Sequence, residues 1–566
     1  MNVPRPEFPN PQFERENWMC LNGEWDFIID NERSGEEKGY VSKEGFKQKI
    51  IVPFCPESKL SGIAHTDFIH SVWYKKTVTL SDESLSGRVF LHIGACDYET
   101  DIWVNDTYIG NHKGGYTHFS FEVSKALNIG ENLITIRAID NTKSGLQTTG
   151  KQSERYASHG CFYTRTTGIW QTVWLEFVPE NYIKNFRFYT DAENASVSAV
   201  IEAKGNADAE MFVYYDGKEV GYAKKCDCGD NFTLGTVLSE KHLWELGKGR
   251  LYDVTIKYGD DIVKTYFGLR SASMSGMKFL LNGKSVYQRL VLDQGFYPDG
   301  VYTAPTEQDL IKDIKISMDA GFNGARLHQK VFEPRFLYHA DKMGYMVWGE
   351  YPSWGFYYNV VSNMNIFINE WLESISRDFN HPSIVCWCPF NETWDRPNKN
   401  RQDNEVLRVI YNVTKATDTT RPCIDTSGNY HVITDIYDLH DYCQDLEEFK
   451  KHCNEFSETG KPWETFPERQ QYGGQPFAIS EYGGISISND GGWGYGKVAK
   501  SLDEFYERYT SLTTTLLNYK ECFSFCYTQL YDVEQEINGI YTYDRKPKCD
   551  ISKIYAANTQ KAAIEE

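Results

Sequence analysis

Hydrophobic and polar positions alternate with a period of two over the first 180 residues. In the stretch 21–27, Leu21, Gly23, Trp25 and Phe27 fall on one face of an extended chain, with polar residues between them. Similar short runs, separated by polar turns, occur at 73–80, 88–93, 100–104, 132–139 and 172–176. Many short strands without a helical period predict a β-sandwich over residues 1–180. Within it the segment 141–167 is long and poor in strand pattern, and such loops are often functional.

A second and smaller β-rich unit is expected at residues 181–272. Its alternating runs lie at 183–189, 197–203, 210–215 and 252–258. This spacing, in a unit of roughly a hundred residues, is typical of an immunoglobulin-like sandwich. We find no catalytic pattern in it.

After residue 272 short apolar runs alternate with segments of helical period. Strands are expected at 285–292, 323–328, 345–349, 384–388, 423–426, 436–439, 477–480 and 522–526. The first helix is predicted to begin at Thr306, with Asp309 completing a capping box and Leu310 and Ile314 on its inner face. Eight strands in about 290 residues predict a (β/α)8 (TIM) barrel over residues 273–566.

Composition narrows the expected partners and location. A formal charge of −20 and a pI near 5.2 leave little basic surface for nucleic acid or an anionic membrane. No run of 18 apolar residues occurs, and no basic segment followed by an apolar one begins the chain. The 14 cysteines, several of them inside apolar runs, are interpreted as reduced thiols. We therefore expect a cytoplasmic protein without nucleic-acid or membrane partners.

Two glutamates follow predicted barrel strands. The apolar run 384–388 leads into Asn391 and Glu392, and the run 477–480 leads directly into Glu481. Carboxyl ends of barrel strands meet at one mouth of the barrel, where active sites lie. Two carboxylates that face each other across such a mouth are the requirement for glycoside hydrolysis.

These stretches resemble glycoside hydrolase family 2, and the likeness covers nearly the whole chain. The segments 21–27 and 168–174 resemble the family's sugar-binding jelly-roll domain, and the middle unit resembles its immunoglobulin-like domain. The segment 381–392 resembles the acid/base signature, and Glu481-Tyr482-Gly483-Gly484 resembles the nucleophile segment. The resemblance implies a retaining exo-β-glycosidase with Glu392 as acid/base, Glu481 as nucleophile and Asn391 binding the sugar 2-hydroxyl.

Further site residues are expected with less support from the pattern. Arg326 and His328 resemble family residues that orient the nucleophile and bind hydroxyls, and Tyr442 resembles a tyrosine that donates to the nucleophile. Asp293 is interpreted either as a ligand of a sugar hydroxyl or as a structural residue. Three aromatic residues are candidates for stacking on sugar, with core packing as the alternative: Trp354, Trp394 and Tyr527. Glu350 is the main rival carboxylate.

Departures from the family pattern bear on the substrate. Family β-glucuronidases carry an Asn-x-Lys element whose lysine meets the substrate carboxylate, whereas the corresponding stretch 536–541 has no lysine. A neutral, galactose-like sugar is therefore the first expectation, with β-glucuronidase and α-L-arabinopyranosidase as alternatives. A basic residue from the loop 141–167 could replace the missing lysine. Because Glu350 is followed by Tyr351 and Pro352, the Glu-x-His that binds magnesium in some β-galactosidases is absent, and we predict no metal or other cofactor.

Two interpretations from other classes remain. A metal-dependent barrel hydrolase could use Asp293, His328, Glu350 and His440, although the His-x-His of such enzymes is absent after the first strand. A non-catalytic carbohydrate-binding protein could keep the same scaffold, since a fold does not prove an activity. The expected partner is a carbohydrate, both for a glycosidase and for a carbohydrate-binding protein. The sequence leaves open whether the protein forms a homo-oligomer.

Overall fold

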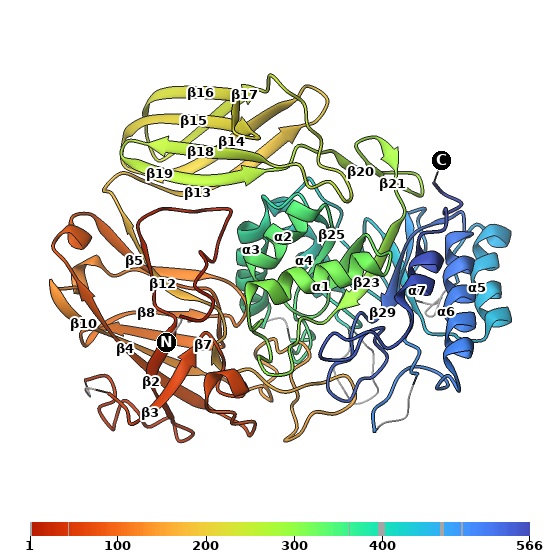
Figure 1. The fold of residues 1–566 in the computed structure, drawn as a ribbon, viewed down its shortest axis with the longest axis horizontal. Helices are drawn as coiled ribbons and strands as arrows, with labels where there is room; N and C mark the ends of the chain where they lie inside the picture. Colours follow the sequence, from red (N-terminus) through yellow and green to blue (C-terminus); the bar gives the residue numbers. More distant parts are fainter. Residues whose placement is uncertain are drawn as a thin grey trace.

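A computed structural model describes residues 3–42, 45–360, 363–393, 402–463, 469–487 and 491–565. Figure 1 shows a β-sandwich in red and orange, a second sandwich in yellow and a barrel in green to blue. In the described part of the chain no helix is both long enough and apolar enough to cross a membrane.

The N-terminal unit is the predicted β-sandwich. A sheet of order β1-β12-β5-β9 packs on a sheet of order β3-β2-β4-β10-β7-β8, and β6 pairs with β11. The face predicted from the alternation is buried, since Trp25 and Phe27 are 1% and 0% exposed. Each buried aromatic side chain of this kind stabilises the sandwich by about 2 kcal/mol. The strands are β1 Trp18–Cys20, β2 Gly23–Ile29, β3 Gln48–Val52, β4 Ser71–Leu80, β5 Arg88–Ile93, β6 Cys96–Asp97, β7 Glu99–Val104, β8 Thr107–Lys113, β9 Phe119–Glu122, β10 Gly130–Ile139, β11 Gly168–Ile169 and β12 Val173–Val178.

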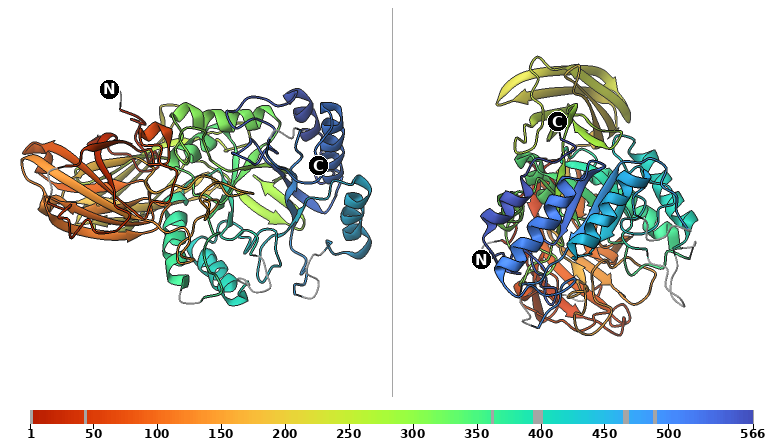
Figure 2. Two further views of the ribbon diagram at one scale, coloured as in Figure 1. Left: turned by 90° about the horizontal axis from the view of Figure 1, so that it is seen from below. Right: turned by 90° about the vertical axis from the view of Figure 1, so that its right-hand side faces the viewer.

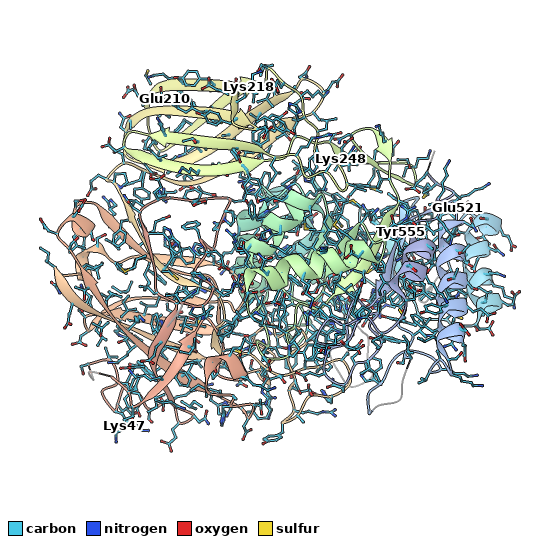
Figure 3. All side chains as sticks on the ribbon, in the orientation of Figure 1. Lys47, Glu210, Lys218, Lys248, Glu521 and Tyr555 are labelled. Carbon is cyan, nitrogen blue, oxygen red and sulfur yellow. The ribbon has the colours of Figure 1, made fainter. Side chains whose placement is uncertain are left out.

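The middle unit is the predicted immunoglobulin-like sandwich. Its sheets have the orders β13-β14-β17 and β16-β15-β18-β19, and all their pairings are antiparallel. Its labelled side chains Glu210 and Lys218 project from the outer surface, away from the barrel (Figure 3). The strands are β13 Tyr182–Asp191, β14 Ser196–Lys204, β15 Ala207–Tyr215, β16 Lys218–Cys228, β17 Asn231–Val237, β18 Tyr252–Tyr258 and β19 Asp261–Phe267.

A buried ion-pair cluster joins the two sandwiches. Arg15 donates to Glu176 of β12 at 2.8 Å and to Asp261 of β19 at 2.8 Å. All three side chains are at most 5% exposed. Breaking such a pair would leave a buried charge without a partner, so the cluster fixes the relative position of the two units.

The C-terminal unit is the predicted barrel. Its described strands form a parallel sheet of order β26-β25-β24-β23-β29-β28-β27. Helices cover the outside, and Figure 2 shows α5, α6 and α7 along one side. A small sheet precedes it, formed by β20 Ala272–Ser275, β21 Lys278–Leu281 and β22 Lys284–Ser285. The barrel strands are β23 Gln288–Asp293, β24 Gly324–Leu327, β25 Met346–Glu350, β26 Ile384–Cys388, β27 Tyr437–Asp441, β28 Phe477–Gly483 and β29 Cys522–Thr528. The helices are α1 Glu307–Asp319, α2 Pro334–Met343, α3 Met364–Asp378, α4 Asn404–Thr417, α5 Leu446–Thr459, α6 Leu502–Leu517 and α7 Ile551–Asn558.

The first barrel helix begins where the capping pattern predicts. The Thr306 amide donates to the Asp309 carboxylate at 2.9 Å, which satisfies a backbone group that the helix leaves unpaired. Leu310 and Ile314 of α1 are buried against the sheet.

The prediction of a strand at 423–426 is wrong in detail. Among the described residues, this part of the chain makes only isolated parallel bridges, between Cys423 and Trp387 of β26 and between Ser427 and Asn391, which follows β26. The carboxylate of Asp425 accepts from the amides of a following loop, at Val432 and Ile433, so the chain bends away before a ladder extends. The segment still lies between β26 and β27, because the Ser427 hydroxyl donates to Asp438 of β27 at 2.7 Å.

Candidate active site

The two predicted catalytic glutamates lie on either side of His440. The His440 Nδ1 atom is 2.7 Å from a Glu392 oxygen and 3.4 Å from a Glu481 oxygen. One ligand atom from each of the three residues lies within 4.8 Å of the other two. Retaining glycosidases hold their carboxyl groups about 5–5.5 Å apart, and inverting ones about 6.5–9.5 Å apart. The separation therefore fits retention.

Glu392 and Glu481 reach this position in different ways. Glu392 follows β26 and has a left-handed backbone conformation, with φ of 47°, which is uncommon for a residue with a side chain. Its amide donates to the Ser427 carbonyl at 2.8 Å, which holds the turn in place. Glu481 lies inside β28, because that strand runs on to Gly483.

The environment of Glu481 stabilises its ionised form. Arg326 donates to one carboxylate oxygen at 3.2 Å, and the Tyr442 hydroxyl donates to the other. Burial raises the pKa of Glu481, but the positive charges of His440 and Arg326 outweigh burial and lower the pKa to about 2. Glu481 is therefore a carboxylate at neutral pH.

Arg326 connects the ends of four barrel segments. Its guanidinium is fully buried and donates to Glu350 at 2.5 Å, to the Ser480 carbonyl at 2.6 Å and to the Asn391 side-chain oxygen at 3.1 Å. Because Asn391 accepts from Arg326, its amide NH2 group points away from the guanidinium. That buried nitrogen has no hydrogen-bond partner among the described residues. It is a free donor in the site.

Glu350 is held by other protein groups. Its oxygens accept from Arg326 at 2.5 Å and lie 3.0 Å from His328 Nδ1. Burial raises the pKa of Glu350, yet Arg326 and His328 outweigh it and lower the pKa. This places His328 in the network that orients Arg326 and gives Glu350 no free position toward the catalytic pair.

The other predicted site residues differ in whether their side chains are free to contact a ligand. Trp354 is partly exposed and its indole NH donates to the Asn391 carbonyl at 2.8 Å. Asp293 is 2% exposed and accepts from Tyr531 and from the Gly295 amide, so protein groups occupy it. Burial raises the pKa of Asp293 to about 6. Tyr527 is fully buried, with its ring 4.8 Å from that of Tyr509, so it packs in the barrel wall and offers no face to a sugar. Trp394 lies outside the described residues.

Two neighbours of Glu481 were not predicted to take part in glycoside hydrolysis: His440, which the sequence indicated only for the metal-dependent alternative, and Tyr495. His440 stands two positions before Tyr442 at the end of β27, and that spacing places both side chains on one face of the strand. Tyr495 stacks on the ring of Tyr442, with centroids 3.5 Å apart and planes at 7°. The position of His440 near a strand end indicated it only for the metal-dependent alternative, and no pattern indicated Tyr495.

A loop of the N-terminal sandwich also reaches the barrel mouth (Figure 1). The Thr149 amide donates to the Trp354 carbonyl at 2.8 Å, and the Tyr163 hydroxyl donates to Glu536 at 2.6 Å. Between them, the Lys151 ammonium lies 4.0 Å from the centre of the Trp354 ring. Burial lowers the pKa of Lys151, but nearby Cys161, Glu536 and the catalytic pair outweigh burial and raise it. The unusual length of the segment 141–167 and the missing lysine at 536–541 were the indications of this contribution.

A carboxylate pair at this spacing, at the mouth of a (β/α)8 barrel, is the arrangement of a retaining glycoside hydrolase. Comparison with family models agrees with this class. The TIM barrel domain of glycosyl hydrolases family 2 matches residues 273–561, the family's sugar-binding domain matches 62–179, and a third model of the family matches 181–270. The chain belongs to glycosyl hydrolases family 2.

Relatives with curated names are distant. A β-glucuronidase of Streptococcus agalactiae is 23% identical over 66% of this chain and 66% of its own length. A β-galactosidase of Thermoanaerobacterium thermosulfurigenes is 24% identical over 66% of this chain and 53% of its own length, and the β-glucuronidase of Homo sapiens is 25% identical over 72% and 68%. The chain thus spans less than two thirds of the first two relatives. The crystal structure of Ruminococcus gnavus β-glucuronidase has the same fold, with a TM-score of 0.81 at 18% identity over 99% of both chains.

Proposed function

We propose that this protein is a retaining exo-β-glycosidase that removes terminal β-D-glucuronic acid. The observation that carries the catalytic part is the pair Glu392 and Glu481, each within 3.4 Å of the same His440 nitrogen. The assignment of the sugar as glucuronic acid is supported by the β-glucuronidases among the relatives and by a lysine that the sandwich loop brings to the site.

In the first step Glu481 attacks the anomeric carbon. Glu392 donates its proton to the glycosidic oxygen as the carbon–oxygen bond breaks, so the aglycone leaves as a neutral alcohol and the sugar becomes esterified to Glu481. Arg326 and Tyr442, which donate to the two oxygens of Glu481, aim the attacking oxygen. The unpaired Asn391 amide donates to the sugar 2-hydroxyl, a contact that strengthens in the transition state.

In the second step water replaces the aglycone. Glu392, now a carboxylate, removes a proton from the water molecule. The water oxygen attacks the anomeric carbon from the face that the aglycone left. The ester bond to Glu481 breaks and the sugar departs with its original configuration. Two inversions at one carbon give net retention.

A β-galactosidase is the second candidate, on the basis of Glu536 and Asn538. These residues stand where family β-glucuronidases carry Asn-x-Lys, and the Asn538 amide donates to Glu536 at 3.2 Å. A carboxylate at that position repels a uronic acid and suits a hydroxyl. The relative named β-galactosidase adds to this alternative.

The test is hydrolysis of 4-nitrophenyl β-D-glucuronide, β-D-galactoside, β-D-glucoside, β-D-mannoside and α-L-arabinopyranoside. We expect the glucuronide to be turned over, with the β-anomer as first product by NMR and with activity lost in Glu481→Ala. Glu447→Ala is the matched control, since the Glu447 side chain is 80% exposed on α5. Full activity in Glu481→Ala, or the α-anomer as first product, would refute the mechanism. Turnover of the galactoside alone would replace the proposed sugar with the second candidate.

A further inference from the structure

The N-terminal sandwich holds Lys151 rigidly at the barrel mouth. The Lys151 carbonyl accepts from the Tyr163 amide at 2.7 Å, and the next residue, Gln152, donates to Asp97 of β6 at 2.7 Å. On the barrel side, the Gly150 amide donates to the Trp354 carbonyl at 3.2 Å. The backbone that carries Lys151 is thus attached both to its own domain and to the loop after β25.

The ammonium group of Lys151 lacks a hydrogen-bond acceptor. The residue is 5% exposed, and within the described ranges its nitrogen makes neither a hydrogen bond nor an ion pair. The Trp354 ring, 4.0 Å away, provides a cation–π contact on one side. The nitrogen is not among the fully enclosed polar atoms without a partner, so it remains accessible. An ammonium can donate three hydrogen bonds, and a ligand that brings an acceptor would use them.

Glu536 does not fill that role. Its two oxygens accept from the Tyr163 hydroxyl at 2.6 Å and from the Asn538 amide at 3.2 Å, both neutral donors. Burial raises the pKa of Glu536, and Lys151 only partly offsets this. The glutamate is therefore supported by uncharged groups, and the ammonium keeps its donors free.

Two free donors border the catalytic pair and are linked through Trp354. The indole ring contacts the Lys151 ammonium, and the indole NH donates to the carbonyl of Asn391, whose own amide nitrogen is unpaired. Because Glu392 and Glu481 lie near enough to raise the pKa of Lys151, a sugar seated between them is expected to meet both donors. Asn391 suits a hydroxyl, and the charged Lys151 suits an anion.

We propose that Lys151 binds the carboxylate of the uronic acid and so determines that the enzyme accepts an acidic sugar. This inference rests on the proposed function. The lysine comes from the sandwich loop, whereas the barrel stretch 536–541 carries none. The substrate carboxylate then supplies the acceptor that the ammonium lacks in the free protein.

The test compares Lys151→Met with Lys143→Met on two substrates that differ only at C6, 4-nitrophenyl β-D-glucuronide and β-D-glucoside. Lys143 is the matched control, because it belongs to the same loop and contacts the ring of Phe68, outside the catalytic site. We expect Lys151→Met to lower kcat/KM for the glucuronide by about 100-fold or more, as for truncation of one partner of a buried charge pair. The glucoside should change by less than about threefold, Lys143→Met should resemble the unmodified protein, and Lys151→Arg should restore part of the glucuronide activity.

Equal losses on both substrates would overturn the inference, because they indicate a structural role for Lys151. A loss confined to the glucoside would overturn it as well, since Lys151 would then bind the hydroxymethyl group. Failure of the proposed function is distinguishable, because it appears in the unmodified protein as absent glucuronide turnover. Inhibition by D-glucuronate gives a second measurement, in which Lys151→Met should weaken inhibition by D-glucuronate and leave inhibition by D-glucose unchanged.

Discussion

Replacing His440 by asparagine should move the acid limb of the pH–rate profile upwards. The pKa of Glu481 lies at about 2 instead of its ordinary 4.5, which corresponds to about 3 kcal/mol in favour of the ionised form. Burial opposes this shift, and His440 is the strongest of the groups that produce it. Asparagine keeps a polar side chain and removes the positive charge. We therefore expect the pKa of Glu481 to rise by about one to two units.

The assay is kcat/KM for a 4-nitrophenyl glycoside between pH 3 and 8, with stability at each pH checked by return to pH 7. In the unmodified protein Glu481 stays ionised across this range, so its protonation does not limit the rate. In His440→Asn the rate should fall with an apparent pKa of about 3 to 4. The matched control is His452→Asn, because His452 lies 2.7 Å from Asp441 at the end of the same strand and outside the catalytic pair.

The same change affects acid stability, and its sign follows from the direction of the shift. Since the folded pKa of Glu481 is below its ordinary value, its contribution to stability is present above pH 4.5 and is lost as the pH falls toward 2. His440→Asn should reduce this contribution and flatten the loss. Identical acid limbs in both proteins, with activity retained, would show that His440 does not control the ionisation of Glu481. An equal shift in His452→Asn would also refute the reasoning.

Three other measurements examine the site and its support. Azide should rescue Glu481→Ala with formation of the α-glycosyl azide, and it should rescue Glu392→Ala with formation of the β-glycosyl azide. NMR spectra that show the two anomers exchanged would reverse the assigned roles of the two glutamates. Asn391→Ala should lower kcat/KM by about 100-fold on the normal substrate and far less on its 2-deoxy analogue, whereas equal losses would contradict the contact with the 2-hydroxyl. Burial lowers the pKa of His431, but Asp425 and Asp438 raise it from 6.5 to about 10, so its contribution to stability is full below pH 6.5 and is lost as the pH rises through 10. The Tm measured from pH 6 to 10 should therefore fall more steeply than in His431→Asn, and parallel curves would rule this out.

The position of Glu392 and Glu481 was predictable because it depends on local pattern and chain direction. A buried apolar run identifies a strand, and the parallel order of the barrel places the residues that follow such runs at one mouth. Glu392 and Glu481 are at that mouth, and the family motifs agree with the pattern. The strand predicted at 423–426 was wrong in detail because a side chain, Asp425, pairs with backbone amides that the pattern cannot reveal.

The roles of residues that depend on long-range contacts were harder to predict from the sequence. Tyr527 has an aromatic side chain that could stack on a sugar, but close packing against Tyr509 buries its ring. His440 acquires its role from two carboxylates that are distant in sequence, at 2.7 and 3.4 Å. No periodicity connects Lys151 with Trp354, since they belong to different domains. Distances between residues of different domains depend on tertiary packing. One sequence considered alone contains little information about that packing.

The contact between domains extends along the loop that carries Lys151. The loop after Gly160 lies against the barrel, because the Trp493 indole and the Gln535 amide both donate to the Gly160 carbonyl at 2.7 Å. The Phe162 ring, two residues further on, is 5.3 Å from the Trp354 ring. A second domain therefore contacts the barrel beside Trp354, on the side where Lys151 also lies. Under the proposed function, the sandwich contributes the charge that selects the sugar, while the barrel contributes the two carboxylates that cleave the bond.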